Sequence, residues 1–248
     1  MNIDLSQLER SKYSSAMFII ISLIVLIVNV GACIPILVLG NGVKSEHIWF
    51  SLMDAFAFFQ LILAPLVIAS LYTLCVQVEN KHNMWKIIKS SGIDLNRIFH
   101  IKFWFMQKKL IALYLLQLLV LIIVGKGLGI QLPIPWLDLG FYALSIIGIN
   151  FALSAVHYYL ALRFENPMLG MAIAVFGALS GIGFSLISKM LTYFVPYSWY
   201  SFLIRIQHNF VDGKLSQHLI SPNIYPLLAG VILGIIFYQL GQKVEVEA

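Results

Sequence analysis

Charged side chains are scarce in this chain of 248 residues. Only 11% of the residues are Asp, Glu, Lys or Arg, whereas 60% are hydrophobic. A soluble domain carries about 25% charged residues, so the composition excludes an ordinary soluble globular protein. It indicates a polytopic membrane protein instead, and the length limits residues 1–248 to a single bundle of helices.

Cysteine is also rare. The chain has two cysteines, Cys33 and Cys75, and each lies within an apolar stretch. If successive spans alternate in direction, Cys33 lies toward the outer end of its span and Cys75 near the inner end of the next. At about 1.5 Å of rise per residue, their separation is well over the roughly 7 Å that a disulfide can bridge. We therefore expect both to be small core residues.

Motifs for chemistry are missing as well. The sequence has no Gly-x-x-x-x-Gly-Lys-Ser/Thr run, so it lacks that phosphate-binding loop. Its six histidines are scattered, without a His-Glu-x-x-His motif or a cysteine pair at ligand spacing, so we predict no metal site and no cofactor. No serine has an evident base nearby in the sequence. The chain is predicted not to be an enzyme.

Long apolar runs, in contrast, are abundant. A helix needs about 20 apolar residues to cross the hydrocarbon core of a bilayer. Six runs approach or exceed that length, at residues 16–39, 50–78, 106–125, 139–162, 168–188 and 223–242. The first run is too long for a signal-peptide core and lacks a small-residue cleavage site, so we expect it to be a span. The sequence thus predicts an all-α fold with six transmembrane helices.

The basic residues fall unevenly on the two sides of these spans. If the N-terminus is inside, eleven Lys and Arg residues lie in the inner segments, namely Arg10, Lys12, Lys81, Lys86, Lys89, Arg97, Lys102, Lys108, Lys109, Arg163 and Lys243. The outer segments hold five, namely Lys44, Lys126, Lys189, Arg205 and Lys214. Because cytoplasmic loops are enriched in basic residues, both termini are expected in the cytoplasm. The net charge of +5 therefore reflects topology and does not indicate a nucleic-acid partner.

The second and third spans are joined by the most basic loop. A helix can continue from residue 79 to residue 89, and Asp94 can cap a second amphipathic helix over residues 95–105. Gly92 permits the bend between them. Two interpretations remain open for this pair of segments, because a basic amphipathic helix can lie on anionic lipid or dock on another protein.

The connection between the fifth and sixth spans, residues 189–222, is apolar, aromatic and interrupted by Pro196. It is too short to span the membrane after this proline and too apolar for an ordinary loop. Tyrosine and tryptophan are typical of the lipid headgroup level. We therefore expect a re-entrant or interfacial helical pair before the last span.

The basic loop resembles that of type-2 ABC transporter permeases. Glu79 ends the second span, the stretch "MWKIIKSSGID" follows, and Lys102 precedes the third span. In that family this loop carries the coupling helix, which docks on the ATP-binding subunit. The residues that match the docking segment are Trp85, Lys86, Ile87, Ile88 and Gly92. One departure is that Asn83 and Met84 stand where the family often has a glycine.

A docking helix needs an apolar anchor surrounded by charges, and we expect Trp85 and Ile88 to form that exposed ridge.

The six-span order and the stretch "VPYSWY" are most similar to permeases that protect lantibiotic producers by exporting the peptide. The resemblance implies a multi-pass protein of the bacterial plasma membrane. It implies four kinds of partner: two copies of an ATP-binding subunit, a second permease (identical or homologous), the lipid bilayer and an amphipathic peptide substrate.

Two other functions remain as alternatives. A membrane scaffold or sensor partner that transports nothing would need only the helical bundle and the basic loop. A secondary transporter would need broken spans with ions or carboxylates near the middle of the membrane. The uncharged middles of the predicted spans argue against the secondary transporter.

Several polar and small residues inside the spans are further candidates. Asp54 and Asp138 are either interfacial carboxylates or, together with Trp199, the lining of an outer cavity. Gly177 and Gly181 allow close packing, either within the bundle or at the interface with a second permease. The remaining polar residues are expected to hydrogen-bond between helices or to pack in the core, and they are Asn29, Gln60, Gln117, Asn150 and His157.

Overall fold

The computed structural model describes residues 15–38, 46–80, 84–211 and 214–244. Its helices are α2 (Ser15–Val38), α3 (Ile48–Asn80), α4 (Met84–Ser90), α5 (Leu95–Gly127), α6 (Trp136–Arg163), α7 (Pro167–Ile187), α8 (Lys189–Phe194), the 3-10 helix η2 (Pro196–Leu203) and α9 (Tyr225–Gln242). Two strands, β1 (Ile206–Val211) and β2 (Lys214–Leu219), complete the elements. Within these ranges, six helices are long and apolar enough to cross a membrane: α2, α3, α5, α6, α7 and α9. The chain is therefore a helical multi-pass membrane protein.

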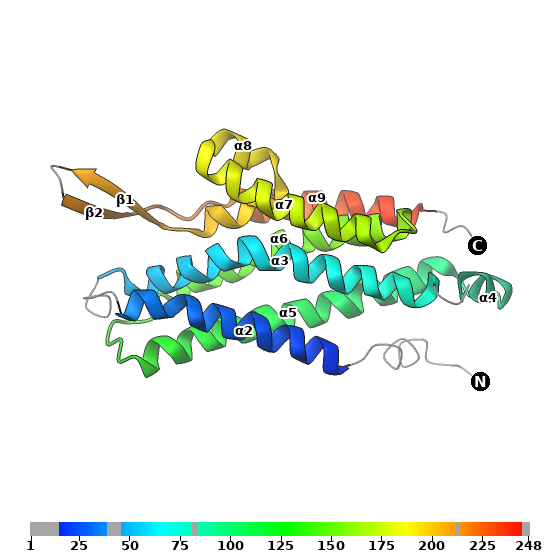
Figure 1. Cartoon of the computed structure of the whole chain (residues 1–248), viewed down its shortest axis with the longest axis horizontal. Helices are drawn as coiled ribbons and strands as arrows, with labels where there is room; N and C mark the ends of the chain where they lie inside the picture. Colours follow the sequence, from blue (N-terminus) through cyan, green and yellow to red (C-terminus); the bar gives the residue numbers. More distant parts are fainter. Residues whose placement is uncertain (1–14, 39–45, 81–83, 212–213, 245–248) are drawn as a thin grey trace.

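The six long helices run along the long axis of the molecule (Figure 1). Helix α4 lies at one tip of this bundle, and the β1–β2 hairpin lies at the opposite tip. We call these the α4 end and the hairpin end. Helix α2 begins and α9 finishes toward the α4 end (Figure 1). The first described span thus begins, and the last described span ends, on the same side of the bundle, as an even number of crossings requires.

Helices α3 and α5 are the longest, with 33 residues each. At about 1.5 Å per residue each measures about 50 Å, well beyond a hydrocarbon core of ~30 Å. The helix expected over residues 95–105 is not separate but forms the first third of α5. The reason is that no glycine or proline interrupts the chain between Leu95 and Leu110. The two helices therefore extend beyond one side of a hydrocarbon core of that thickness, and α4 lies at their ends.

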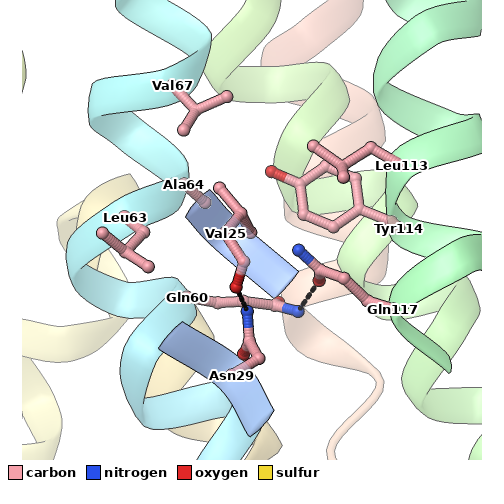
Figure 2. Close-up of a pocket in the computed structure, with 9 residues that line it drawn as sticks. All are labelled: Val25, Asn29, Gln60, Leu63, Ala64, Val67, Leu113, Tyr114 and Gln117. Carbon is pink, nitrogen blue, oxygen red and sulfur yellow. Dashed lines mark hydrogen bonds between the residues drawn. The ribbon is translucent and has the colours of Figure 1, made fainter. Parts of the chain in front are cut away.

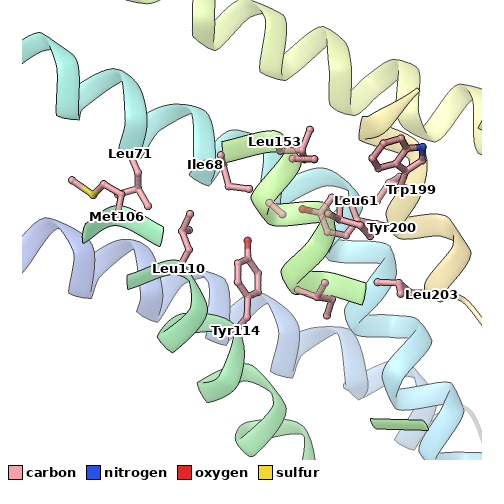
Figure 3. Close-up of a cluster of buried hydrophobic side chains, with 14 of the residues drawn as sticks. Leu61, Ile68, Leu71, Met106, Leu110, Tyr114, Leu153, Trp199, Tyr200 and Leu203 are labelled. Atoms are coloured by element: carbon pink, nitrogen blue, oxygen red, sulfur yellow. The ribbon is translucent and has the colours of Figure 1, made fainter. Parts of the chain in front are cut away.

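Helix α3 is the centre of the bundle, because it packs against α2, α5, α6, α7 and η2. Figure 3 shows part of the core, where side chains from α3 and α5 meet Leu153 of α6 and Tyr200 of η2. The closest helix pair is α6 with α9. A Cβ atom on Gly230 would lie 2.5 Å from the backbone of Gly148, so this pair needs a glycine at the crossing. Such close backbone contact is a common source of stability in membranes.

The segment between α7 and α9 contains two short helices, α8 and η2, as the sequence predicts. It also contains a β-hairpin that was not expected. Helix η2 is largely buried against α3, α6 and α7. Strands β1 and β2 pair antiparallel, from Ile206 with Leu219 to Val211 with Lys214. The dipeptide Asp212-Gly213 between the strands is typical of two-residue hairpin loops, so the sequence did contain a signal for this hairpin.

Candidate functional site

A buried ion pair joins two spans at the α4 end. The Nζ atom of Lys102 lies 2.9 Å from Oε1 of Glu79, and both side chains are completely buried. Lys102 also donates a hydrogen bond to the carbonyl oxygen of Cys75, at 3.2 Å. Glu79 lies in the last turn of α3 and Lys102 near the start of α5. The pair therefore holds together the two helices between which α4 is inserted.

Two apolar residues hold α4 itself against the bundle. The indole Nε1 of Trp85 donates to Oδ1 of Asn80, the last residue of α3, at 2.6 Å. Trp85 and Ile88 are only 6% and 7% exposed, and both belong to the hydrophobic core. From the sequence, these two residues were expected to form an exposed ridge. The structure shows the opposite, because the apolar side of this amphipathic helix faces the chain's own core.

The outward side of α4 is basic with one apolar residue at its centre. Ile87 is 52% exposed, and Lys86 and Lys89 are exposed on either side of it. Arg97 is exposed in the first turn of α5. We call Lys86, Ile87, Lys89 and Arg97 the α4 face. It can contact a surface that offers acidic groups around an apolar contact.

Local chemistry fixes the corner between α4 and α5. Helix α4 ends with hydrogen bonds from the amides of Ser91 and Gly92 back to Ile87 and Lys89. Gly92 has a φ of 71°, a left-handed conformation that favours glycine. Asp94 then caps α5, accepting a hydrogen bond from the amide of Asn96 at 3.0 Å. The predictions for Gly92 as the bend and Asp94 as the N-cap are confirmed, and the α4 face is firmly attached to two spans.

At the hairpin end, Arg205 brings the two predicted carboxylates together. Asp54 of α3 accepts hydrogen bonds from the backbone amides of Arg205 and Ile206, each at 2.8 Å. The Arg205 side chain lies 2.7 Å from Oδ1 of Asp138 and donates to the carbonyl oxygen of Ile220 at 2.5 Å. These contacts attach the end of η2 and the base of the hairpin to α3 and α6. We call the three residues Asp54, Asp138 and Arg205 the outer clasp.

Arg205 is the residue that sequence reasoning missed. A single arginine in an apolar, aromatic connection, facing two acids inside spans, was the signal available, because buried charges in membranes need a partner. The pocket beside the outer clasp holds about 10 Å³, roughly the space of one water molecule. Trp199 does not line this pocket. It is buried, and its indole donates to the carbonyl oxygen of Tyr193 at 3.1 Å.

The two glycines proposed for a permease interface are covered by the chain itself. A Cβ atom on Gly177 would lie 2.6 Å from the ring of Tyr197, and one on Gly181 would lie 2.9 Å from its backbone. Both glycines therefore make room for η2 against α7. Of the two readings left open for them, the structure favours packing within the bundle.

Among the described residues, no cluster of three or more His, Cys, Asp or Glu side chains could hold a metal ion. Comparison of the sequence with protein-family models and with curated proteins, and of the fold with solved structures, finds no match.

Proposed function

We propose that this chain is the membrane-spanning permease subunit of an ATP-driven exporter, and that its α4 face docks on a cytoplasmic ATP-binding subunit. The observation that carries the proposal is the attachment of α4 to two spans, to α3 through Trp85 and to α5 through the capped corner at Asp94. Glu79 and Lys102 join α3 to α5, while Trp85 and Ile88 press α4 onto their core. A push on the α4 face therefore reaches both spans directly.

A helix that only rests on lipid would not need this attachment. Taking two charges out of water costs several kcal/mol per ion, which their mutual attraction repays only in good geometry. A lipid-bound helix can be joined to its spans by flexible loops, because anionic lipid attracts each basic residue by about 1 kcal/mol whatever the joint. The buried pair Glu79–Lys102 and the capped corner at Asp94 favour docking.

The nature of the partners comes from the loop's resemblance to type-2 ABC permeases. The sequence has no phosphate-binding loop, so ATP hydrolysis belongs to a separate subunit, present in two copies. A second permease, identical or homologous, completes the transporter. The pockets beside Asp138 and beside Gln60 each hold only about 10 Å³. We propose that a peptide cargo, such as an amphipathic lantibiotic, passes between this chain and the second permease.

We assign the α4 end to the cytoplasm of a bacterial cell, and η2 to a re-entrant segment on the opposite side of the plasma membrane. The basic asymmetry of the sequence and the position of both α2 and α9 at the α4 end support this orientation. Ser90 and Ser221 are both exposed, at opposite ends of the bundle. In Ser90→Cys the thiol should react with an impermeant maleimide only in inside-out vesicles, and in Ser221→Cys only in intact cells. The unaltered chain is the control, because Cys33 and Cys75 are buried.

The docking test compares two similarly exposed isoleucines at opposite ends. Ile87 on the α4 face is 52% exposed, and Ile220 at the hairpin end is 41% exposed. The tagged chain is purified from its native membranes, and associated ATP-binding protein is detected by photolabelling with azido-ATP. Ile87→Asp should abolish the labelled partner, while Ile220→Asp should retain it. Equal recovery of the partner in both variants contradicts docking at α4, and ATP hydrolysis by the isolated chain contradicts the permease assignment itself.

A membrane scaffold or sensor partner is the second candidate, and the small size of the named pockets favours it. Such a protein would bind its partner through the same α4 face without moving cargo. Export and a scaffold or sensor role can be distinguished in cells that produce the lantibiotic or resist it. If the chain exports the peptide, the variant Ile87→Asp, which does not dock, should lower the survival of cells exposed to the lantibiotic. It should also raise the amount of peptide associated with the cells. Lower survival with unchanged peptide content would instead assign the chain to sensing.

A further inference from the structure

Three carboxamide side chains meet in the apolar middle of the bundle. Asn29 comes from α2, Gln60 from α3 and Gln117 from α5, and they point toward one another in Figure 2. Each is at most 2% exposed. Gln60 follows the start of α3 at Ile48 by 12 residues, and Gln117 precedes the end of α5 at Gly127 by 10. That is roughly 15–18 Å of helix, close to the middle of a ~30 Å hydrocarbon core.

The three groups do not satisfy one another. Gln60 Nε2 donates to Gln117 Oε1 at 2.9 Å, and Asn29 Nδ2 donates to the carbonyl oxygen of Val25 at 2.7 Å. Three buried atoms have no hydrogen-bond partner among the described residues, namely Asn29 Oδ1, Gln60 Oε1 and Gln117 Nε2. If the oxygen and nitrogen of both glutamine amides were exchanged, the pair would still have one unpaired carbonyl oxygen and one unpaired amide nitrogen. A polar atom left unpaired in hydrocarbon costs free energy, so these three need a ligand.

We propose that the cavity between α2, α3 and α5 binds one water molecule that bridges Asn29, Gln60 and Gln117. The cavity lined by these residues holds about 10 Å³, roughly the space one water occupies. Water donates two hydrogen bonds and accepts up to two. It can therefore donate to the two carbonyl oxygens and accept from the amide of Gln117, which matches the unpaired atoms one for one.

The lining excludes charged ligands of the same size. No Asp, Glu, Lys, Arg or His lines the cavity. A bare cation would face the N–H group of Gln117, and an anion would face two carbonyl oxygens. A neutral molecule with both donors and acceptors fits the site, and the volume limits that molecule to water. This water site does not depend on the chain being an exporter.

The first experiment detects the water in the unaltered protein. Brief X-ray irradiation splits bound water into hydroxyl radicals, which oxidise adjacent side chains and are read by mass spectrometry in ¹⁸O-labelled water. Tyr114 lines the cavity, and Tyr72, a fully buried tyrosine of the core, is the matched control. Tyr114 should be oxidised severalfold faster than Tyr72. Equal oxidation rates would overturn the proposal, and this arm needs no variant.

The second experiment asks whether Asn29 and Gln60 are coupled, although the structure shows no hydrogen bond between their side chains in the part of the chain it describes. The melting temperatures of Asn29→Leu, Gln60→Leu and the double variant form a cycle. If one water bridges them, the loss in the double variant should be smaller than the sum of the two single losses. Asn29→Leu combined with Asn150→Leu, whose Asn150 pairs with Tyr200, is the control and should be additive. Additive losses in both pairs contradict the bridging water.

Discussion

An ion pair lies at each end of the described part of the bundle, and the two pairs have different surroundings. At the α4 end, Glu79 and Lys102 are sealed from solvent and join two transmembrane helices. At the hairpin end, the side chains of Arg205 and Asp138 remain 10% and 29% exposed, and they join a connecting segment to a helix. A sealed pair is strongly destabilised when one partner is removed, whereas a pair open to water is weakly coupled and screened by salt.

The difference suggests different mechanical roles. The sealed pair joins α3 to α5, and Trp85 ties α4 to the end of α3, an arrangement that suits the proposed transmission of force from a partner subunit. The outer clasp can open without exposing a fully buried charge, because Asp138 already contacts solvent. It therefore fixes the position of η2 and the hairpin without tying the spans to each other as firmly. Four sets of substitutions test this contrast, and their expected costs in stability decrease from the sealed pair to the α4 face.

Removing the lysine of the sealed pair should have the largest effect. Lys102→Met removes the lysine that pairs with the buried Glu79 carboxylate, and loss of one partner from a buried pair costs about 3–5 kcal/mol. We expect a large fall in the thermal unfolding midpoint of the purified protein. The double variant Glu79→Leu/Lys102→Met is the control, because an apolar pair of similar volume should recover most of the stability. A midpoint for Lys102→Met close to that of the unaltered protein would contradict the conclusion that the sealed pair stabilises the bundle more than the outer clasp does.

The carboxylate of the outer clasp should have a smaller and more local effect. Asp54 accepts two backbone hydrogen bonds, and an intramolecular hydrogen bond contributes a net of about 0.5–1.5 kcal/mol, so their sum is below the cost of breaking the sealed pair. Asp54→Ala should accelerate amide hydrogen exchange at Arg205 and Ile206 while exchange in α5 stays unchanged. Asp54→Asn, which keeps one carbonyl acceptor, should be intermediate. Faster exchange throughout the bundle would show that the clasp supports the whole fold and not only its outer segment.

The exposed member of the clasp should matter less still. Asp138→Ala removes an ion pair whose acid is 29% exposed, so the loss should be about 1 kcal/mol or less. Because salt screens exposed charges, the difference between this variant and the unaltered protein should shrink in 1 M NaCl. The deficit of Lys102→Met should persist in the same buffer. Equal salt dependence of the two variants would contradict the contrast between an open and a sealed pair.

The α4 face should have almost no effect on stability. Lys86→Gln and Ile87→Ala change exposed side chains, and such substitutions usually shift stability by less than about 0.5 kcal/mol. Trp85→Ala, on the same helix, should be clearly destabilising because its side chain is buried and bonded to Asn80. Melting curves of the three variants measure the difference. A stable Trp85→Ala protein would mean that this side chain is free to serve as the docking anchor.

The membrane fold and several local features follow from the amino-acid sequence alone. Low charge and long apolar runs require helices in a bilayer, since every backbone group there must be hydrogen-bonded within the segment. Gly92 and Asp94 set the corner before α5, because a left-handed turn and an N-cap are decided by neighbouring residues. The Asp212-Gly213 signal for the hairpin was equally local and could have been read.

The sides of these elements that face inward depend on the packing of distant helices. A pattern with Trp85 and Ile88 on one side of α4 and Lys86 and Lys89 on the other specifies an amphipathic helix, but not whether its apolar side meets a partner or the chain's own core. Arg205 became part of a site only when η2 folded back to Asp54, which lies 151 residues away in the chain. Contacts of this kind depend on how distant helices pack, and no local propensity encodes them.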